Sequence, residues 1–256
     1  MKIARFTVQG EKRIHIGIVE GEIIREVKGD IFGEWTYTEE LFQLAKVTLL
    51  APLIPNQVIG IGKNFVSSED ELPDELPEIP VFFFKPVSSV IGPDEKIKLP
   101  PQHEQVKFEA ELAVVIGKEA KDIEEKGVQD YIFGYTIGND VTSAQHFHPD
   151  GHWTIGKAFD SFTPLGPAIE TNLDLINVRV QAAHNGKLKQ DSSITLMIIS
   201  IPKMISYLSK VMTLQPGDVI LTGSPIGAEL LKVDDCIECM IEGIGVLRNS
   251  VMKVEK

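Results

Sequence analysis

Phe108–Gly117 reads FEAELAVVIG and is the stretch of the sequence that decides the fold. Side chains of a strand alternate between two faces, so the apolar residues at every second position from Phe108 share one face. Glu109 and Glu111 share the other, with Cα atoms roughly 7 Å apart. Two neighbouring carboxylates in an apolar strand repel each other and resist the loss of water. A bound divalent cation would relieve both costs, because hard cations prefer carboxylate oxygens. The alternative is a strand with one solvated face that carries both glutamates.

The composition is that of a globular protein with 256 residues, 43% of them hydrophobic and 24% charged. This length supports one large domain, or a small domain beside a larger one. The formal net charge is -12 at pH 7 and no run is rich in Lys or Arg, so nucleic acid and anionic membranes are not expected partners. The start of the sequence lacks a signal-peptide pattern, and no apolar run approaches the roughly 18 residues of a membrane helix. The expected compartment is the cytoplasm.

The chain divides into two expected domains, a small β-rich unit at residues 1–52 and a larger catalytic unit at residues 53–256. In the small unit, apolar residues at helical spacing predict a short helix over Thr38–Val47. The larger unit is mainly β with few helices, and it shows no regular alternation of strands and helices that would indicate a Rossmann fold or an α/β barrel.

Three local patterns in the larger unit predict individual elements. Asn185-Gly186 is a strong hairpin signal, because a type I′ turn needs positive φ at both central positions. Apolar spacing predicts a helix over Ile201–Met212, and a charged helix is expected near Ala120–Lys126. Cys236 and Cys239 lie three apart in a strand-like segment, so they point to opposite faces. They are therefore expected to be packed cysteines rather than a redox or zinc pair.

A third carboxylate, Asp140, ends the strand predicted over Tyr131–Val141. If this strand lies beside the one with the two glutamates, three carboxylates face one point and can hold a divalent cation. The spacing in the sequence does not show that the strands are neighbours. A turn-forming aspartate is an equally good interpretation at this stage.

The order of several motifs resembles the fumarylacetoacetate hydrolase family, in particular its acylpyruvase and 2-hydroxyhepta-2,4-diene-1,7-dioate isomerase-like branch. The resemblance extends from about Val58 to Val254. Each motif is weak alone, but their joint order is specific. The matching blocks are Gly62–Phe65, Pro80–Pro86, Phe108–Gly117, Asn139–Thr142, Trp153–Asp160, Leu165–Pro167, Pro216–Pro225 and Ile241–Gly245.

The resemblance implies a mixed β-roll catalytic domain, a homodimer, and a site for Mg²⁺ (or Mn²⁺ or Ca²⁺). The family's metal ligands correspond to Glu109, Glu111 and Asp140. The family lysine of the Lys-x-Phe-Asp block corresponds to Lys157. A lysine beside a polarised substrate oxygen can stabilise an enolate or a carboxylate by its charge.

The resemblance also implies a substrate-binding set. Lys63 matches a basic position that meets a substrate carboxylate, and its neighbour Asn64 belongs to the same block. Ser224 occupies a position where the family usually has threonine, and it keeps the hydroxyl group. The implied substrate is a small 2-oxo acid whose oxygens bind the metal.

Two departures from the family pattern bear on the reaction. The family loop Asn-Tyr-x-x-His-x-x-Glu has Ser68 at the histidine position and keeps a glutamate at Glu71. Glu71 is therefore a candidate catalytic residue, acting alone or through water, with an ordinary acidic loop as the alternative. Further along, Ala144 and Phe147 replace the family's arginine and glutamine, so substrate recognition should differ. His146, His148 and His152 gather nearby. Either one of them supplies the base or binds substrate, or all three belong to an ordinary polar loop.

The primary hypothesis is a Mg²⁺-dependent hydrolase that cleaves a carbon–carbon bond of an acylpyruvate-like 2-oxo acid through an enolate. Decarboxylation or enol–keto isomerisation of a 2-oxo dicarboxylate is the close alternative, because neither needs an activated water. A third hypothesis is a family member that binds metal and oxo acid with little turnover.

Overall fold

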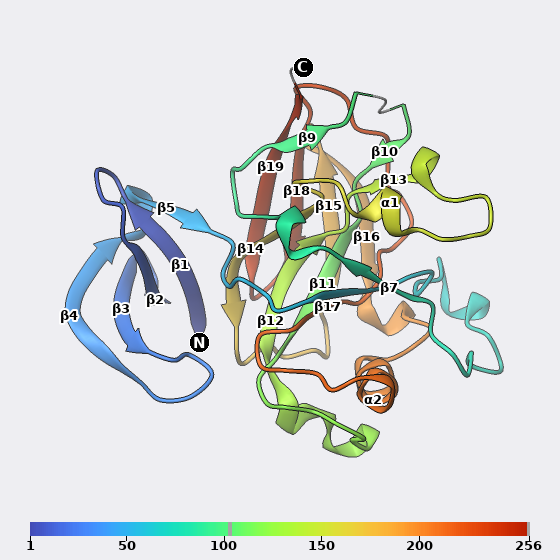
Figure 1. Ribbon diagram of the computed structural model, residues 1–256, viewed down its shortest axis with the longest axis horizontal. Coiled ribbons are helices and arrows are strands. Elements are labelled where there is room, and N and C mark those ends of the chain that lie inside the picture. The colour runs from blue at the N-terminus through green and yellow to red at the C-terminus, as the bar shows by residue number, and fades with distance from the viewer. Residues whose placement is uncertain (102–103, 255–256) are drawn as a thin grey trace.

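The computed structural model describes residues 1–101 and 104–254, in which strands dominate (Figure 1). The prediction of a mainly β chain with few helices is confirmed. The strands are β1 (Lys2–Val8), β2 (Ile14–Glu20), β3 (Ile23–Gly29), β4 (Trp35–Gln43), β5 (Val47–Leu50), β6 (Val58–Ile61), β7 (Phe82–Lys85), β8 (Val90–Ile91), β9 (Ile97–Leu99), β10 (Val106–Lys107), β11 (Ala110–Ile116), β12 (Ile132–Asn139), β13 (Thr142–Ser143), β14 (Thr163–Glu170), β15 (Arg179–His184), β16 (Lys187–Ser193), β17 (Val219–Leu221), β18 (Cys236–Ile241) and β19 (Gly245–Lys253).

The helices in these ranges are short. They are the α-helices α1 (Thr154–Lys157) and α2 (Ile201–Val211), and the 3₁₀ helices η1 (Leu44–Lys46), η2 (Glu69–Glu71), η3 (Val87–Ser89), η4 (Glu125–Tyr131), η5 (Ala144–His146) and η6 (Ile194–Leu196). Within the described residues, no helix combines the length and apolar character that crossing a bilayer requires.

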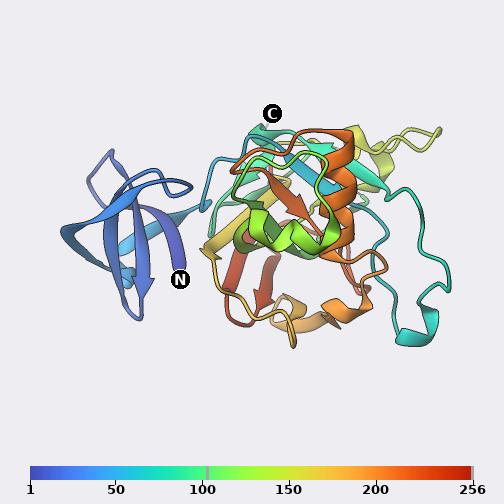
Figure 2. The ribbon, with the colours of Figure 1, turned by 90° about the horizontal axis from the view of Figure 1, so that it is seen from below.

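The N-terminal strands form an antiparallel unit in the order β4-β3-β2-β1, with β5 also paired to β1. This unit stands to one side of the main β-roll (Figures 1 and 2). It is joined to the roll through β1, which pairs with β14 at Lys2↔Glu170 and Ile3↔Ile169.

The prediction of a helix over Thr38–Val47 is wrong. Most of this segment is strand β4, followed by the single 3₁₀ turn η1. Pairing with β3 outweighs the helical spacing, because it places the Phe42 ring against those of Phe6 and His15, at centroid distances of 5.1 and 4.9 Å. Packing of this kind routinely overrides weak helix propensity.

A buried polar cluster joins three strands of the N-terminal unit. Glu26 on β3 is 1% exposed, and its carboxylate accepts hydrogen bonds from His15 Nδ1 at 2.8 Å, from Thr38 Oγ1 at 2.9 Å, and from Arg13. Burial alone would raise the pKa of Glu26, but the contacts with His15, Thr38 and Arg13 outweigh it and hold that pKa below its usual value.

Glu26→Gln should lower the free energy of unfolding at pH 7 by about 2–4 kcal/mol, because hydrogen bonds to a buried charge are lost. The folded-state pKa of Glu26 is lowered, so its contribution is present above the unfolded pKa and is lost as the pH falls through the folded pKa. Urea unfolding at pH 7 and pH 4 should show the gap between native and variant protein narrowing at low pH. The turn variant Glu22→Gln is the control, and an equal effect of both substitutions would contradict this interpretation.

The main ladder runs β14-β12-β11-β17-β6-β7, with β11 at its centre. The alternation expected for this segment is confirmed. The alternate residues from Phe108 to Ile116 are fully buried in the larger core, whereas Ala113 and Val115 on the other face are buried in a second core. β11 therefore has no solvated face, and Glu111, at 2% exposed, is not a hydrated surface residue.

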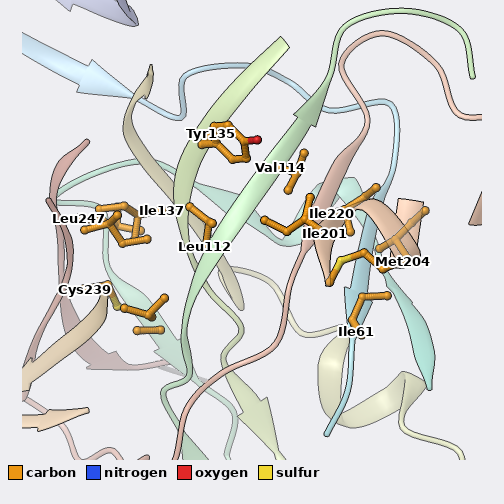
Figure 3. Packing of buried hydrophobic residues seen from close by; sticks show 14 of the residues in the cluster. Ile61, Leu112, Val114, Tyr135, Ile137, Ile201, Met204, Ile220, Cys239 and Leu247 are labelled. Carbon is orange, nitrogen blue, oxygen red and sulfur yellow. The ribbon is translucent and has the colours of Figure 1, made fainter. Parts of the chain in front are cut away.

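A second sheet, β16-β15-β18-β19-β9, encloses the larger core together with α2. Figure 3 shows Leu112 of β11 and Ile137 of β12 beside Leu247 of β19, while Met204 of α2 lies near Ile61 of β6. The predicted helix over Ile201–Met212 is confirmed as α2.

The hairpin prediction is also confirmed. Asn185 and Gly186 have φ of 50° and 74° and connect β15 to β16. Cys236 and Cys239 are free thiols on β18, and burial raises the pKa of Cys239.

The charged helix expected near Ala120–Lys126 is wrong, because the helical turn begins only at Glu125. Asp122 has φ of 50°, a left-handed conformation that interrupts a helix. Backbone groups here bond to α2 instead. The N–H of Ile123 donates to Ser209 Oγ at 3.1 Å, and its carbonyl accepts from Ser206 Oγ at 2.8 Å.

Candidate functional site

A cavity of about 500 Å³ opens where β11 and β12 meet the loop that follows β17. Its floor is acidic and includes Glu109, Glu111 and Asp140, and its walls are mainly aromatic and aliphatic. Phe147 and Trp153 stack at a centroid distance of 5.6 Å and form one wall. The cavity is large enough for a small organic acid.

The three predicted metal ligands come together in space. One carboxylate oxygen from each of Glu109, Glu111 and Asp140 can be chosen so that all three lie within 4.8 Å of one another. The ladder between β11 and β12 fixes this arrangement. The N–H of Asp140 donates to the carbonyl of Glu109 at 2.8 Å, and the N–H of Glu109 donates to Asn139 Oδ1 at 3.0 Å. Glu111 Oε2 accepts from the N–H of Gly223 at 2.7 Å.

Two buried lysines neutralise part of this negative charge. Lys157 Nζ donates to Glu109 Oε2 at 2.9 Å, to Thr142 Oγ1 at 2.7 Å, and to Asp140. Lys85 Nζ donates to the other oxygen of Asp140 at 2.6 Å. Sequence reasoning missed Lys85. The pattern of Phe82–Lys85 could have indicated it, because alternation places the lysine on the buried face of the strand. A buried ammonium group needs a charged partner.

The pKa shifts of the site residues show which of their charges is unfavourable without a cation. Burial, followed by the charges of Asp140 and Glu109, raises the pKa of Glu111 well above its usual value. Burial also acts on Asp140, but the ammonium groups of Lys157 and Lys85 outweigh it and hold the pKa of Asp140 below its usual value. Burial would lower the pKa of Lys157, yet the carboxylates of Asp140 and Glu109 raise it. A cation would stabilise the charged form of Glu111, so this all-oxygen set fits a hard divalent ion.

The predicted substrate-binding residues differ in position. Lys63 and Ser224 both line the cavity. Lys63 adopts a left-handed conformation with φ of 54°, and its ammonium group lies 5.9 Å from the centre of the Trp153 ring. Such backbone strain often marks a functional position.

Asn64 does not line the cavity and is 2% exposed. Its amide donates to the carbonyls of Ile199 and Thr222, at 3.1 and 2.8 Å, and accepts from the N–H of Ile199 at 2.8 Å. Both amide hydrogens are thus used within the protein, so the structure places Asn64 behind the cavity wall rather than in it.

The structure does not bring Glu71 into the cavity. It is exposed on η2, at the far edge of the molecule from the N-terminal unit (Figure 2), and Oε2 accepts from the N–H of Ser67 at 2.9 Å. Ser68 lines a neighbouring cavity of about 380 Å³ instead. The residues at the two replaced positions, Ala144 and Phe147, do line the main cavity.

The clustered histidines are also outside the site. His146 Nδ1 lies 2.7 Å from Ser143 Oγ and its ring packs on Phe159, whereas His148 lies 3.4 Å from Asp150. None of the described residues that line the cavity is a histidine.

Gln190 is a second residue that sequence reasoning missed. It is fully buried, and its Oε1 accepts from the N–H of Ala110 at 3.0 Å, between the two glutamates. Its Nε2 donates to Ser224 Oγ at 2.9 Å and to the carbonyl of Pro225 at 2.6 Å. Gln190 thus ties the opposite wall of the cavity to the acidic strand.

Comparison with known proteins defines the class of this chain. The family model described as Fumarylacetoacetate (FAA) hydrolase C-terminal matches residues 57–252, and the model described as Rv2993c-like, N-terminal matches residues 1–52. The chain therefore belongs to the fumarylacetoacetate hydrolase family, and the predicted family and β-roll fold are confirmed.

Two solved structures and one curated relative illustrate the range of its relatives. The 2-hydroxyhepta-2,4-diene-1,7-dioate isomerase from Mycobacterium marinum is 36% identical with a TM-score of 0.91, over 100% of both chains. A maleylpyruvate hydrolase from Sphingobium sp. SYK-6, in complex with manganese(II) and pyruvate, is 26% identical with a TM-score of 0.83, again over 100% of both chains. The mitochondrial oxaloacetate tautomerase fahd2 of Xenopus laevis is 37% identical over 228 residues, which are 84% of this chain and 71% of that protein.

Proposed function

We propose that this protein is an enol–keto tautomerase of a small 2-oxo acid, working with Mg²⁺ or Mn²⁺ held by Glu109, Glu111 and Asp140. The observation that carries the proposal is the composition of the cavity. It joins an acidic triad to the buried ammonium of Lys157, while Glu71 lies outside. Hydrolysis needs a base that activates water. Tautomerisation consumes no water: the enol oxygen loses a proton, the enolate is stabilised, and the neighbouring carbon takes a proton that solvent can supply.

Each part of the cavity has a distinct task in this proposal. A divalent cation, when bound, supplies Lewis-acid polarisation of the substrate oxo group. Lys157 Nζ stabilises the negative charge that develops on the enolate oxygen, and Lys63 Nζ binds the substrate carboxylate. The aromatic wall of Phe147 and Trp153 excludes water, which strengthens these charge interactions.

Two named relatives support this reading, because one is an oxaloacetate tautomerase and another an isomerase of a dicarboxylate. Cleavage of a carbon–carbon bond in an acylpyruvate is the second candidate, favoured by the maleylpyruvate hydrolase whose structure contains manganese and pyruvate. It would require the segment with Glu71 to move over the cavity. Decarboxylation and ligand binding with little turnover are the remaining alternatives.

The test compares three reactions of the purified protein in Mg²⁺. They are loss of the ultraviolet absorbance of enol-oxaloacetate, formation of pyruvate from oxaloacetate, and cleavage of acetylpyruvate. Tautomerisation should exceed both other rates by at least about tenfold, as its barrier is lower by 1.4 kcal/mol or more. Acetylpyruvate cleavage at an equal or higher rate would favour the hydrolase. Tight binding of oxaloacetate without any turnover would favour a binding role.

A further inference from the structure

Lys107 is a cavity residue to which neither the motifs nor the proposed mechanism gives a task. It lies on β10, which pairs with β13 so that Lys107 is opposite Thr142. Its Nζ lies 2.6 Å from Glu109 Oε1, and its side chain remains 36% exposed where it lines the cavity. An ammonium group has three N–H donors, so one ion pair leaves Lys107 able to bind a further anion.

The charges around the cavity favour a ligand with more than one negative charge. Lys63, Lys85, Lys107 and Lys157 supply four ammonium groups, against the three carboxylates of the triad. The excess is one positive charge, which a divalent cation would raise to three, in a chain whose net charge is -12. A local positive site of this kind concentrates small anions.

Two of these lysines, Lys63 and Lys107, are placed to bind the carboxylates of a ligand, whereas Lys157 lines the cavity beside the triad and Lys85 does not line it. The side chains of Lys85 and Lys157 are 0% and 5% exposed and are directed onto Asp140. Lys63, beside Trp153, and Lys107, beside Glu109, are the more exposed pair.

Lys107 also lies next to the position where the family arginine is replaced. The N–H of Ala144 donates to the carbonyl of Gln105 at 3.2 Å, so Ala144 continues the β10–β13 pairing. Ala144 brings no charge to this wall of the cavity, and Lys107, on the adjoining strand, brings one.

We propose that Lys107 binds the distal carboxylate of the substrate and selects a 2-oxo dicarboxylate over a 2-oxo monocarboxylate. This inference rests on the proposed function, in which Lys63 binds the first carboxylate and the cation site binds the oxo group. The second carboxylate then meets Lys107 Nζ, where a charge-assisted hydrogen bond forms. When a monocarboxylate binds, Lys107 stays paired with Glu109 and adds no binding energy for that ligand.

Calorimetric binding to the Mn²⁺-loaded protein tests the assignment with a matched pair of ligands. Oxaloacetate and 2-oxobutyrate differ only by a carboxylate in place of a methyl group. Lys107→Met, which keeps the length of the side chain, should raise the Kd for oxaloacetate about tenfold and leave the Kd for 2-oxobutyrate within about twofold. Lys107→Arg should restore most of the preference for oxaloacetate.

Lys187→Met, at the exposed tip of the β15–β16 hairpin, is the control and should leave both Kd values unchanged. An equal loss of both ligands in Lys107→Met would assign Lys107 to the support of Glu109, and would overturn the inference while the proposed function stands. Unchanged Kd values for both ligands in Lys107→Met would also overturn the inference and leave the proposed function standing. Failure of the native protein to bind either ligand would overturn the proposed function and this inference together.

Discussion

Glu111→Gln should lower kcat/KM for tautomerisation roughly a thousandfold, because the loss of Lewis-acid stabilisation costs several kcal/mol. The amide is nearly isosteric with the carboxylate, and its oxygen can still accept the N–H of Gly223. The substitution therefore removes the charge and keeps the shape. Mn²⁺ affinity, measured by titration calorimetry, should fall in parallel with activity.

The metal-free variant should melt at least as high as the metal-free native protein. Burial and the charges of Asp140 and Glu109 raise the pKa of Glu111, which means that its ionised form destabilises the metal-free fold near neutral pH. Loss of activity would then not reflect unfolding. Glu125→Gln, on the exposed helix η4, is the control. Native activity and Mn²⁺ affinity in Glu111→Gln would show that this carboxylate is not a ligand.

Lys157→Met should lower kcat by about 100- to 1,000-fold, the range observed when one preorganised donor to a developing oxyanion is removed. Mn²⁺ affinity should remain at the native level or rise, because Lys157 Nζ competes with a cation for oxygens of Glu109 and Asp140. The fold should persist, since Asp140 keeps Lys85 as a charged partner at 2.6 Å. Steady-state kinetics together with Mn²⁺ titration separate the two effects.

The exposed Lys118→Met variant is the matched control and should behave as the native protein. Lys157→Arg keeps the charge but not the geometry, so it should recover part of the lost kcat. A parallel fall of kcat and Mn²⁺ affinity in Lys157→Met would assign the lysine to assembly of the metal site. An unchanged kcat would remove it from the reaction.

The sequence predicted the acidic strand well, because alternation is a local property. Glu109 and Glu111 share a face wherever the extended segment lies, and its apolar partners had to be buried. Asp140 could not be placed by the same reasoning. Its position depends on the β11–β12 ladder, which brings its N–H to the carbonyl of Glu109. Only the family resemblance predicted that Asp140 lies beside the two glutamates.

Three further features depended on contacts that local patterns do not carry. Lys85 reaches Asp140 because β6 joins β7 to β17, and β17 lies beside β11, an order that sequence periodicity does not encode. The helix expected over Thr38–Val47 was lost to pairing with β3. Glu71 kept its place in the motif, yet the loop that carries it lies outside the cavity. Motif spacing identifies the residue but not the position of a loop.

In the proposed mechanism, tautomerisation depends on a divalent cation at the acidic triad. The most direct measurement is the decay of enol-oxaloacetate absorbance with protein stripped by a chelator, before and after stepwise addition of Mg²⁺ or Mn²⁺. We expect a fall to the uncatalysed rate in the chelator and full recovery as one equivalent of cation binds, with no recovery in Glu111→Gln. A catalysed rate that survives complete removal of divalent cations would contradict the proposed mechanism.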